Sequence, residues 1–154
     1  MAGRPPAAPS DPQEHLLAFL SDGRSYGLPS AEVERITTHA AHVFLVGKNA
    51  YKMKRAVRYS FLDFTTLDQR RRTLEAELEL NRRTAPVLYR RLVPVTRADG
   101  DRLALAGSGE PIEWLLEMAR FDQEARLDHI AERGQLTPAI VDDLAAAIAA
   151  FHAK

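Results

Sequence analysis

The chain has 154 residues, of which 45% are hydrophobic and 27% charged, a composition typical of one globular domain with a buried core. Lys plus Arg and Asp plus Glu both number 21, which excludes a bulk attraction to nucleic acid or anionic membranes, although local patches stay possible. The absence of cysteine excludes disulfides and thiolate metal sites and favours the reducing cytoplasm, and because no apolar run approaches ~20 residues we expect no membrane association.

The N-terminal region is predicted to hold one helix. Residues 1–12 carry Pro and Ala without the apolar core of a secretory signal, so we expect a disordered leader there. Asp11, Pro12 and Glu14 have the order of an N-cap, a first helical residue and an N3 acid, which predicts a helix that ends near residues 21–23. Residues 23–30, GRSYGLPS, are typical of a loop.

Residues 33–57 are predicted to be extended. Turn residues occur at 39–41 and again at 47–49, between apolar runs of strand length. This pattern predicts three short strands in a meander.

A long helix is predicted next, because Thr65-Thr66-Leu67-Asp68 has a capping pattern with Asp68 as the N3 acid. The helix is expected to run to about Thr84, since Pro86 cannot continue it. Residues 92–107, LVPVTRADGDRLALAG, then predict a hairpin that turns at Asp99-Gly100.

The last third of the chain is predicted to hold one more strand and two helices. Residues 112–121, IEWLLEMARF, favour a strand, although such an apolar run also fits a short helix. Residues 122–133 favour a helix that stops at Gly134, and Thr137-Pro138 begins a final helix. That helix has an apolar stripe made of Ile140, Leu144, Ile148 and Phe151. The element order predicts an α+β fold: an antiparallel sheet of about five strands with an inserted helix, followed by C-terminal helices.

The third predicted strand carries two lysines on one face. Side chains two residues apart in a strand share a face, so Tyr51 and Met53 are expected in the core while Lys52 and Lys54 point the other way. Taken alone, this pattern fits the wet face of a half-exposed sheet.

The helix that follows offers a partner for these lysines. On a helical wheel Glu79 points to solvent and Glu75 lies at one border of the apolar stripe, whereas Glu77 lies at the other border, flanked by apolar residues on both sides. A carboxylate there needs a partner, and a lysine of the preceding strand is a natural one. The plainer alternatives are a purely structural ion pair, or a glutamate that reaches solvent. A strand lysine held by a glutamate of the following helix is how kinases position a cation on nucleotide phosphates.

Several segments together resemble the N-terminal lobe of an aminoglycoside phosphotransferase-like, kinase-like domain, of the type that precedes a P-loop ATPase module in bacterial proteins. The segments are VERITTHAAHVFLVG, AYKMKRAV, FLDFTTLDQRRR, ELELNRRTAPVLYRRLVPVT, EWLLEMARF and LTPAIVDDLAAAIAAFHA. The resemblance implies ATP as the nucleotide, with residues 13–121 as the nucleotide-binding lobe and residues 122–154 as the first helices of a second lobe.

The resemblance also implies roles for single residues. Lys52 would contact the phosphates with Lys54 as the reserve, and Glu77 would hold the lysine. Thr38, His39 and Ala40 lie where a turn would cover the phosphates, although that turn is not glycine-rich. The main chain from Met118 through Arg120 to Phe121 would meet the adenine.

The catalytic part of that family has no counterpart here. Residues 149–153, AAFHA, resemble the helix just before the catalytic loop, and the loop, its Asn and the metal-binding Asp are not in this sequence. We therefore expect an inactive chain, either a fragment of a longer protein, which we favour, or a degenerate binding-only relative. Mg²⁺ is expected only together with the missing lobe. The partners would be a nucleotide and the missing lobe or a downstream ATPase module.

Two further readings remain. The chain could be a non-catalytic interaction module that recruits a partner through its last helices. Because those helices would lack a surface to pack on, we also expect marginal stability or homo-oligomers. The arginines at 70–72, 82–83 and 90–91 could bind RNA or an acidic partner, but neighbouring acids favour a solvated face, so nucleic acid is not the expected partner. No histidine cluster has the spacing of a metal site.

Overall fold

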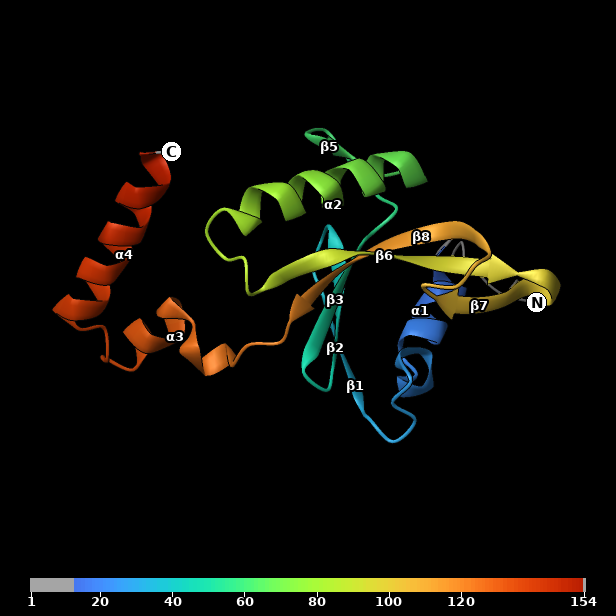
Figure 1. The fold of residues 1–154 in the computed structure, drawn as a ribbon, viewed down its shortest axis with the longest axis horizontal. Coiled ribbons are helices and arrows are strands. Elements are labelled where there is room, and N and C mark those ends of the chain that lie inside the picture. The colour runs from blue at the N-terminus through green and yellow to red at the C-terminus, as the bar shows by residue number, and fades with distance from the viewer. Residues whose placement is uncertain (1–12, 154) are drawn as a thin grey trace, which may run out of the picture.

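A computed structural model describes residues 13–153, which form a six-stranded antiparallel sheet with helices on both faces (Figure 1). The strand order is β1-β2-β3-β8-β6-β7. The strands are β1 (Val33–Thr37), β2 (Ala41–Val46), β3 (Asn49–Lys54), β6 (Tyr89–Ala98), β7 (Arg102–Leu105) and β8 (Glu110–Ala119). The fold is thus α+β, with one strand more than the sequence predicted.

Strands β1 to β3 form the predicted meander. The register places Val43 of β2 opposite Lys52 of β3, and Thr37 of β1 opposite His42. The β2–β3 turn uses Gly47 at φ 53°, a left-handed conformation that favours glycine. Strand β8 then pairs with both β3 and β6, so the segment with two possible readings is a central strand and not a helix.

The long helix α2 (Leu67–Arg82) packs on β8 and β6 and covers one face of the sheet (Figure 1). Its buried side chains include Leu74, which is fully covered. The capping box exists but lies one residue later than predicted: Thr66 is the N-cap and Gln69, not Asp68, is the reciprocal N3 residue. Both side-chain bonds of the box satisfy amide groups that would otherwise be orphaned at the helix start.

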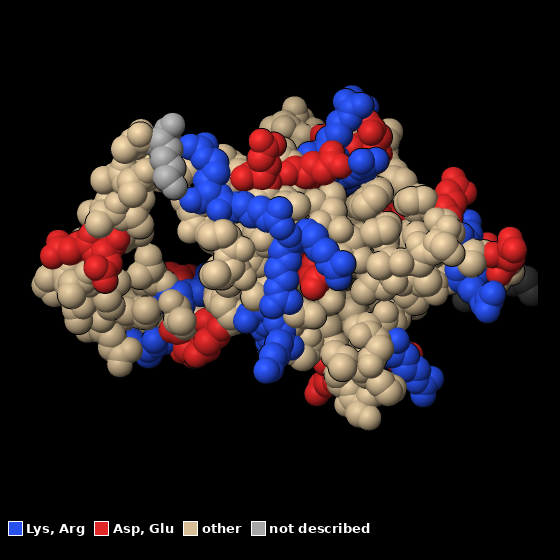
Figure 2. Space-filling model, in the orientation of Figure 1, with Lys and Arg blue, Asp and Glu red and all other residues tan. Residues whose placement is uncertain are grey.

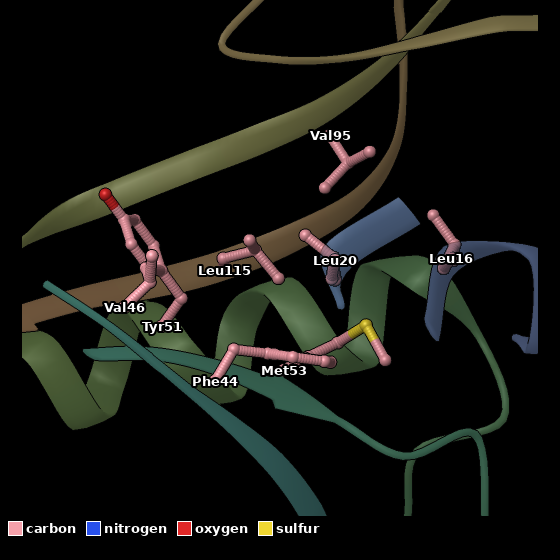
Figure 3. Close-up of a cluster of buried hydrophobic side chains, with 8 residues drawn as sticks. All are labelled: Leu16, Leu20, Phe44, Val46, Tyr51, Met53, Val95 and Leu115. Carbon is pink, nitrogen blue, oxygen red and sulfur yellow. The ribbon is translucent and has the colours of Figure 1, made fainter. Parts of the chain in front are cut away.

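Helix α1 (Glu14–Leu20) covers the opposite face and contributes two of the eight side chains of a compact core. Figure 3 shows Leu16 and Leu20 gathered with side chains from the sheet. The sheet contributes Phe44, Val46, Tyr51, Met53, Val95 and Leu115. Tyr51 and Met53 therefore enter the core as predicted. Lys52 and Lys54, which alternate with them along β3, point to the face that α2 covers.

The start of α1 differs from the prediction. Asp11 and Pro12, like the expected leader 1–12, lie outside the described residues, and the helix begins at Glu14 with Gln13 in the N-cap position. Gln13 makes no capping bond, because its side chain reaches across to the sheet instead. The helix ends at Leu20, as predicted.

Four short elements were not predicted. The expected loop at 23–30 contains a 3-10 helix, η1 (Gly23–Tyr26). A small hairpin of β4 (Arg58–Tyr59) and β5 (Leu62–Asp63) precedes α2. A 3-10 turn, η2 (Asp99–Asp101), carries the predicted β6–β7 connection.

The C-terminal helices extend to one side of the sheet (Figure 1). The expected single helix over 122–133 is divided into η3 (Gln123–Ala125) and α3 (Leu127–Glu132), because the intervening Arg126 has an extended backbone, φ −67° and ψ 141°. Helix α4 (Pro138–His152) has Thr137 as its N-cap, as predicted. Between residues 13 and 153, no helix is both long enough and apolar enough to traverse a bilayer.

Candidate functional site

Glu77 of α2 binds both lysines of β3. The Lys52 ammonium lies 2.5 Å from Glu77 Oε1, and the Lys54 ammonium lies 2.9 Å from Oε2. The pleat of β3 points both lysines at α2, and the wheel position of Glu77 points its carboxylate at the strand. The predicted contact between Lys52 and Glu77 is confirmed, and Lys54 joins it from the same face.

The site is partly withdrawn from solvent, which strengthens its electrostatics. The Glu77 side chain is 15% exposed. Burial raises the pKa of Glu77, but the hydrogen bonds and charges of Lys52 and Lys54 together outweigh this effect and hold the pKa below its ordinary value. The carboxylate is therefore ionised at neutral pH. Two ammonium groups then face one carboxylate, which leaves one positive charge in excess.

The two lysines have different surroundings. Lys54 is 11% exposed and lies over the Phe64 ring, 5.5 Å from its centroid. Lys52 is 27% exposed and lines a cavity. A ligand in that cavity would therefore reach Lys52, while Lys54 is covered by the protein.

The cavity has a volume of about 220 Å³ and lies where β1, β2 and β3 meet the end of β8. Its wall is mainly aliphatic, formed by Ile36, Val43, Leu45, Ala50, Leu88 and Met118. Arg120 and Phe121 line it on the side where β8 ends. The structure thus brings Lys52 together with the three residues of the predicted adenine segment.

The main chain of that segment is partly engaged. The amide of Ala119 donates to the Leu88 carbonyl over 2.8 Å, and the amide of Arg120 donates to the Lys48 carbonyl over 2.9 Å. Within the described part of the chain, the amide of Phe121 donates to no other protein group. One N–H at the rim of the cavity is therefore available to a ligand.

Thr38 and His39 do not line the cavity. The Thr38 hydroxyl accepts a hydrogen bond from the Ala41 amide, and the His39 carbonyl accepts from Arg55 and Tyr59. These bonds brace the β1–β2 turn and occupy polar groups that were expected over the phosphates. The predicted phosphate role of this turn gains no supporting contact.

A buried ion pair was missed by the sequence reasoning, which placed Arg70 on a solvated face. Arg70 is 7% exposed and donates to Glu113, which is fully buried. The Gln13 side chain also donates to Glu113, over 2.7 Å. Arg70 lies four residues before the buried Leu74, so its position on the inner face of α2 was visible in the helical spacing. Together, Gln13, Arg70 and Glu113 join the start of α1, helix α2 and strand β8.

The other two arginines of that run are exposed, as predicted. Arg71 pairs with Glu75 and Arg72 pairs with Asp68, both at a spacing of four residues. Residues 13–153 hold no group of three or more His, Asp or Glu side chains that could bind a metal ion.

Comparisons with known proteins found relatives that are much longer than this chain. The chain is 32% identical over 117 residues to uncharacterized proteins of Mycobacterium bovis and of two Mycobacterium tuberculosis strains. The match covers 76% of this chain, and it spans only 22% of the length of those relatives. No family model matches the chain. No solved structure matches it either.

Proposed function

We propose that the chain is the nucleotide-binding part of an aminoglycoside phosphotransferase-like small-molecule kinase, with ATP as the ligand. The observation that carries the proposal is the bond between Lys52 and Glu77 at the wall of an apolar cavity. A strand lysine held by a glutamate of the next helix is the arrangement that positions a cation on nucleotide phosphates in kinases. The order of strands and helix here supports the same assignment.

The cavity suits the base of the nucleotide rather than the whole molecule. Ligand pockets for whole drug-sized molecules measure roughly 300–1,000 Å³, whereas this cavity measures about 220 Å³ and is mainly aliphatic. A flat purine would be buried there, with the Phe121 amide as a hydrogen-bond donor at the rim. The ribose and phosphates would then leave the cavity on the side of Lys52.

Lys52 is the phosphate ligand in this proposal, and Lys54 is a positioning residue. Lys54 holds the second oxygen of Glu77 and is covered by Phe64, so it fixes the carboxylate without reaching the cavity. The carboxylate in turn keeps the Lys52 ammonium at the cavity wall. The excess positive charge of the trio would be neutralised by the phosphates.

The proposal concerns binding and assigns no step of phosphoryl transfer to these residues. The described residues present no carboxylate cluster that fits Mg²⁺, so no step through a metal ion is assigned to them. The acceptor of the phosphoryl group would be chosen by residues other than those of this cavity.

Calorimetric titration of ATP into the protein and into Lys52→Met tests the proposal. We expect the substitution to weaken ATP binding by at least about tenfold, because a charge-assisted contact to a phosphate is lost. Lys48→Met is the matched control, since Lys48 is an exposed lysine in the β2–β3 connection and does not line the cavity. Equal ATP affinity in all three proteins would overturn the proposal.

A second candidate, a non-catalytic interaction module, is favoured by the surface of the C-terminal helices. Leu144 and Ile148 of α4 are 42% and 50% exposed, and Leu127 of α3 is 42% exposed. Exposed apolar groups of this kind commonly mark protein contacts. Sedimentation velocity over a range of concentrations tests the candidate. Self-association that Ile148→Ser abolishes would support it, and a monomer at every concentration would count against a homo-oligomer.

A further inference from the structure

A stripe of cationic side chains crosses the surface near the end of α2 (Figure 2). Arg90 and Arg91 start β6, and both lie against Glu117 of β8, at 3.5 and 2.8 Å. Arg82, in the last turn of α2, donates to the Tyr89 carbonyl next to them. We call the exposed set the basic stripe: Lys48, Arg82, Arg90, Arg91 and Arg120.

The far end of the stripe borders a surface hollow. Three cations, Lys48, Arg90 and Arg120, line this hollow together with Phe121 and one acid, Asp122. Arg120 reaches Glu34 at 3.2 Å. The stripe thus continues from α2 across the edge of the sheet to the β2–β3 turn, as the blue band in Figure 2 shows.

Three arginines of the stripe each hold one nitrogen of the guanidinium group in a hydrogen bond within the protein. Arg82 and Arg91 each use Nε for a bond within the protein, and Arg90 uses Nη1 for a bond to the Asn49 amide oxygen. Within residues 13–153, the other nitrogens of these three guanidinium groups make no hydrogen bond. Arginines held in this way lose little freedom when they bind a planar anion in a bidentate manner.

The stripe is not neutralised by its neighbours. Three of the five cations, Arg90, Arg91 and Arg120, pair with only two carboxylates, Glu117 and Glu34, and the Glu117 side chain is only 8% exposed. The chain as a whole is neutral, with 21 basic and 21 acidic residues, so this surface concentrates charge that is balanced elsewhere. Such segregation is typical of surfaces that attract an oppositely charged partner.

Apolar side chains beside the stripe favour a protein over a nucleic acid as the partner. Val87, in the loop between Arg82 and Arg90, is 81% exposed, and Phe121 at the other end is 47% exposed. Arginine beside exposed aromatic and apolar groups is typical of protein interfaces. Domains that bind nucleic acid usually have a pI above about 9, whereas the pI of this chain is about 7.0.

We propose that the basic stripe binds an acidic segment of a partner protein, one that carries Asp or Glu together with an apolar side chain that covers Val87. The carboxylates would bind the outward N–H groups of the arginines. The stripe shares Arg120 and the neighbouring Phe121 with the lining of the cavity but contains neither Lys52 nor Glu77, and the proposal rests on neither of those two residues.

Fluorescence anisotropy with three labelled probes tests the proposal on the full chain. The probes are a peptide of repeated Glu-Glu-Leu units, poly-glutamate of equal charge, and a single-stranded oligouridylate of equal charge. We expect the Leu-containing peptide to bind most tightly and to lose at least about tenfold in affinity between about 0.05 and 0.3 M NaCl, because exposed charges are screened.

Matched variants distinguish the stripe from general charge. Lys48→Gln combined with Arg82→Gln should weaken peptide binding about three- to tenfold, because two cations that pair with no acid within residues 13–153 are removed from the stripe. Arg72→Gln combined with Arg102→Gln removes two exposed cations outside the stripe and should leave binding unchanged. Val87→Ser should weaken binding of the Leu-containing peptide but not of poly-glutamate.

Three results would overturn the proposal. They are tighter binding of the oligouridylate than of either peptide, peptide binding that salt does not weaken, and equal losses in the stripe variant and the control variant. Far-UV circular dichroism of each variant ensures that a loss of binding is not a loss of fold.

Discussion

Lys52 and Glu77 are 25 residues apart in the sequence, and their side chains meet at 2.5 Å across the interface between β3 and α2. A second lysine, Lys54, binds the other oxygen of the same carboxylate. The three side chains join the strand to the helix and place one ammonium group at the cavity wall. Their energetics can be measured without any ligand.

Replacement of Glu77 by Gln should destabilise the protein. The neutral amide keeps the size of the side chain but leaves two ammonium groups of low exposure without their counter-charge, at a cost of about 1–3 kcal/mol in the free energy of unfolding. Urea denaturation measures the loss. Glu79→Gln is the control, because Glu79 is exposed on the same helix, and it should change the free energy by less than about 0.5 kcal/mol.

The pH dependence of stability should report the same carboxylate. The pKa of Glu77 is lower in the folded protein than its ordinary value. The unfolded chain therefore binds more protons at this position in mildly acidic solution, so the stabilisation is complete above the ordinary pKa and is lost as the pH falls through the folded pKa. The difference in melting temperature between wild type and Glu77→Gln should be large at pH 7 and should shrink as the pH falls below the ordinary pKa of a glutamate. A constant difference would contradict the shift.

The buried pair of Arg70 and Glu113 should matter more for stability than any exposed pair. Arg70→Met leaves the fully buried Glu113 without its counter-charge, and breaking a buried pair in this way costs about 3–5 kcal/mol. Arg72→Met, which breaks an exposed pair with Asp68, should cost less than about 1 kcal/mol. Guanidinium denaturation of the two variants gives the comparison. Equal, small losses would show that the Glu113 carboxylate tolerates isolation.

The double variant Arg70→Met with Glu113→Leu offers a further check of the same pair. Removing both charges avoids an isolated buried carboxylate, so the double variant should be more stable than Arg70→Met alone. A double variant as unstable as the sum of two separate losses would indicate that packing, not charge, dominates at this position.

Substitutions at the start of α2 distinguish the predicted N-cap, Thr65, from the observed one, Thr66. The structure pairs Thr66 with Gln69, so Thr66→Ala should cost about 1 kcal/mol in unfolding free energy. Thr65→Ala should cost less, because the Thr65 hydroxyl bonds only to Asp63 in an exposed loop. Thermal denaturation of both variants decides between the two registers.

The two-residue alternation of strands and the 3.6-residue spacing of helices were sufficient to predict much of the fold and the centre of the site. The alternation of Tyr51, Lys52, Met53 and Lys54 fixed which side chains enter the core. The wheel position of Glu77 between apolar neighbours was enough to predict a cationic partner, and the structure supplies two, Lys52 and Lys54. These inferences succeeded because burial of apolar surface determines the orientation of both elements.

Other features depend on contacts between distant segments, which no local pattern contains. Gln13 occupies the N-cap position of α1, but its side chain binds Glu113, 100 residues away, instead of capping the helix. The basic stripe combines residues of the β2–β3 turn, α2, β6 and the end of β8, and in the sequence it was visible only as scattered arginine pairs. The division of the 122–133 helix at Arg126 has no evident cause in the sequence.

We propose that Lys52 binds the phosphates of a nucleotide whose base lies in the cavity. The most direct measurement is the ratio of ATP affinity to adenosine affinity, determined by calorimetry for wild type and for Lys52→Met. We predict that wild type prefers ATP by at least about tenfold, and that the preference falls to near unity in Lys52→Met while adenosine binding is unchanged. An undiminished preference for ATP in Lys52→Met, or no binding of either ligand to wild type, would contradict the claim.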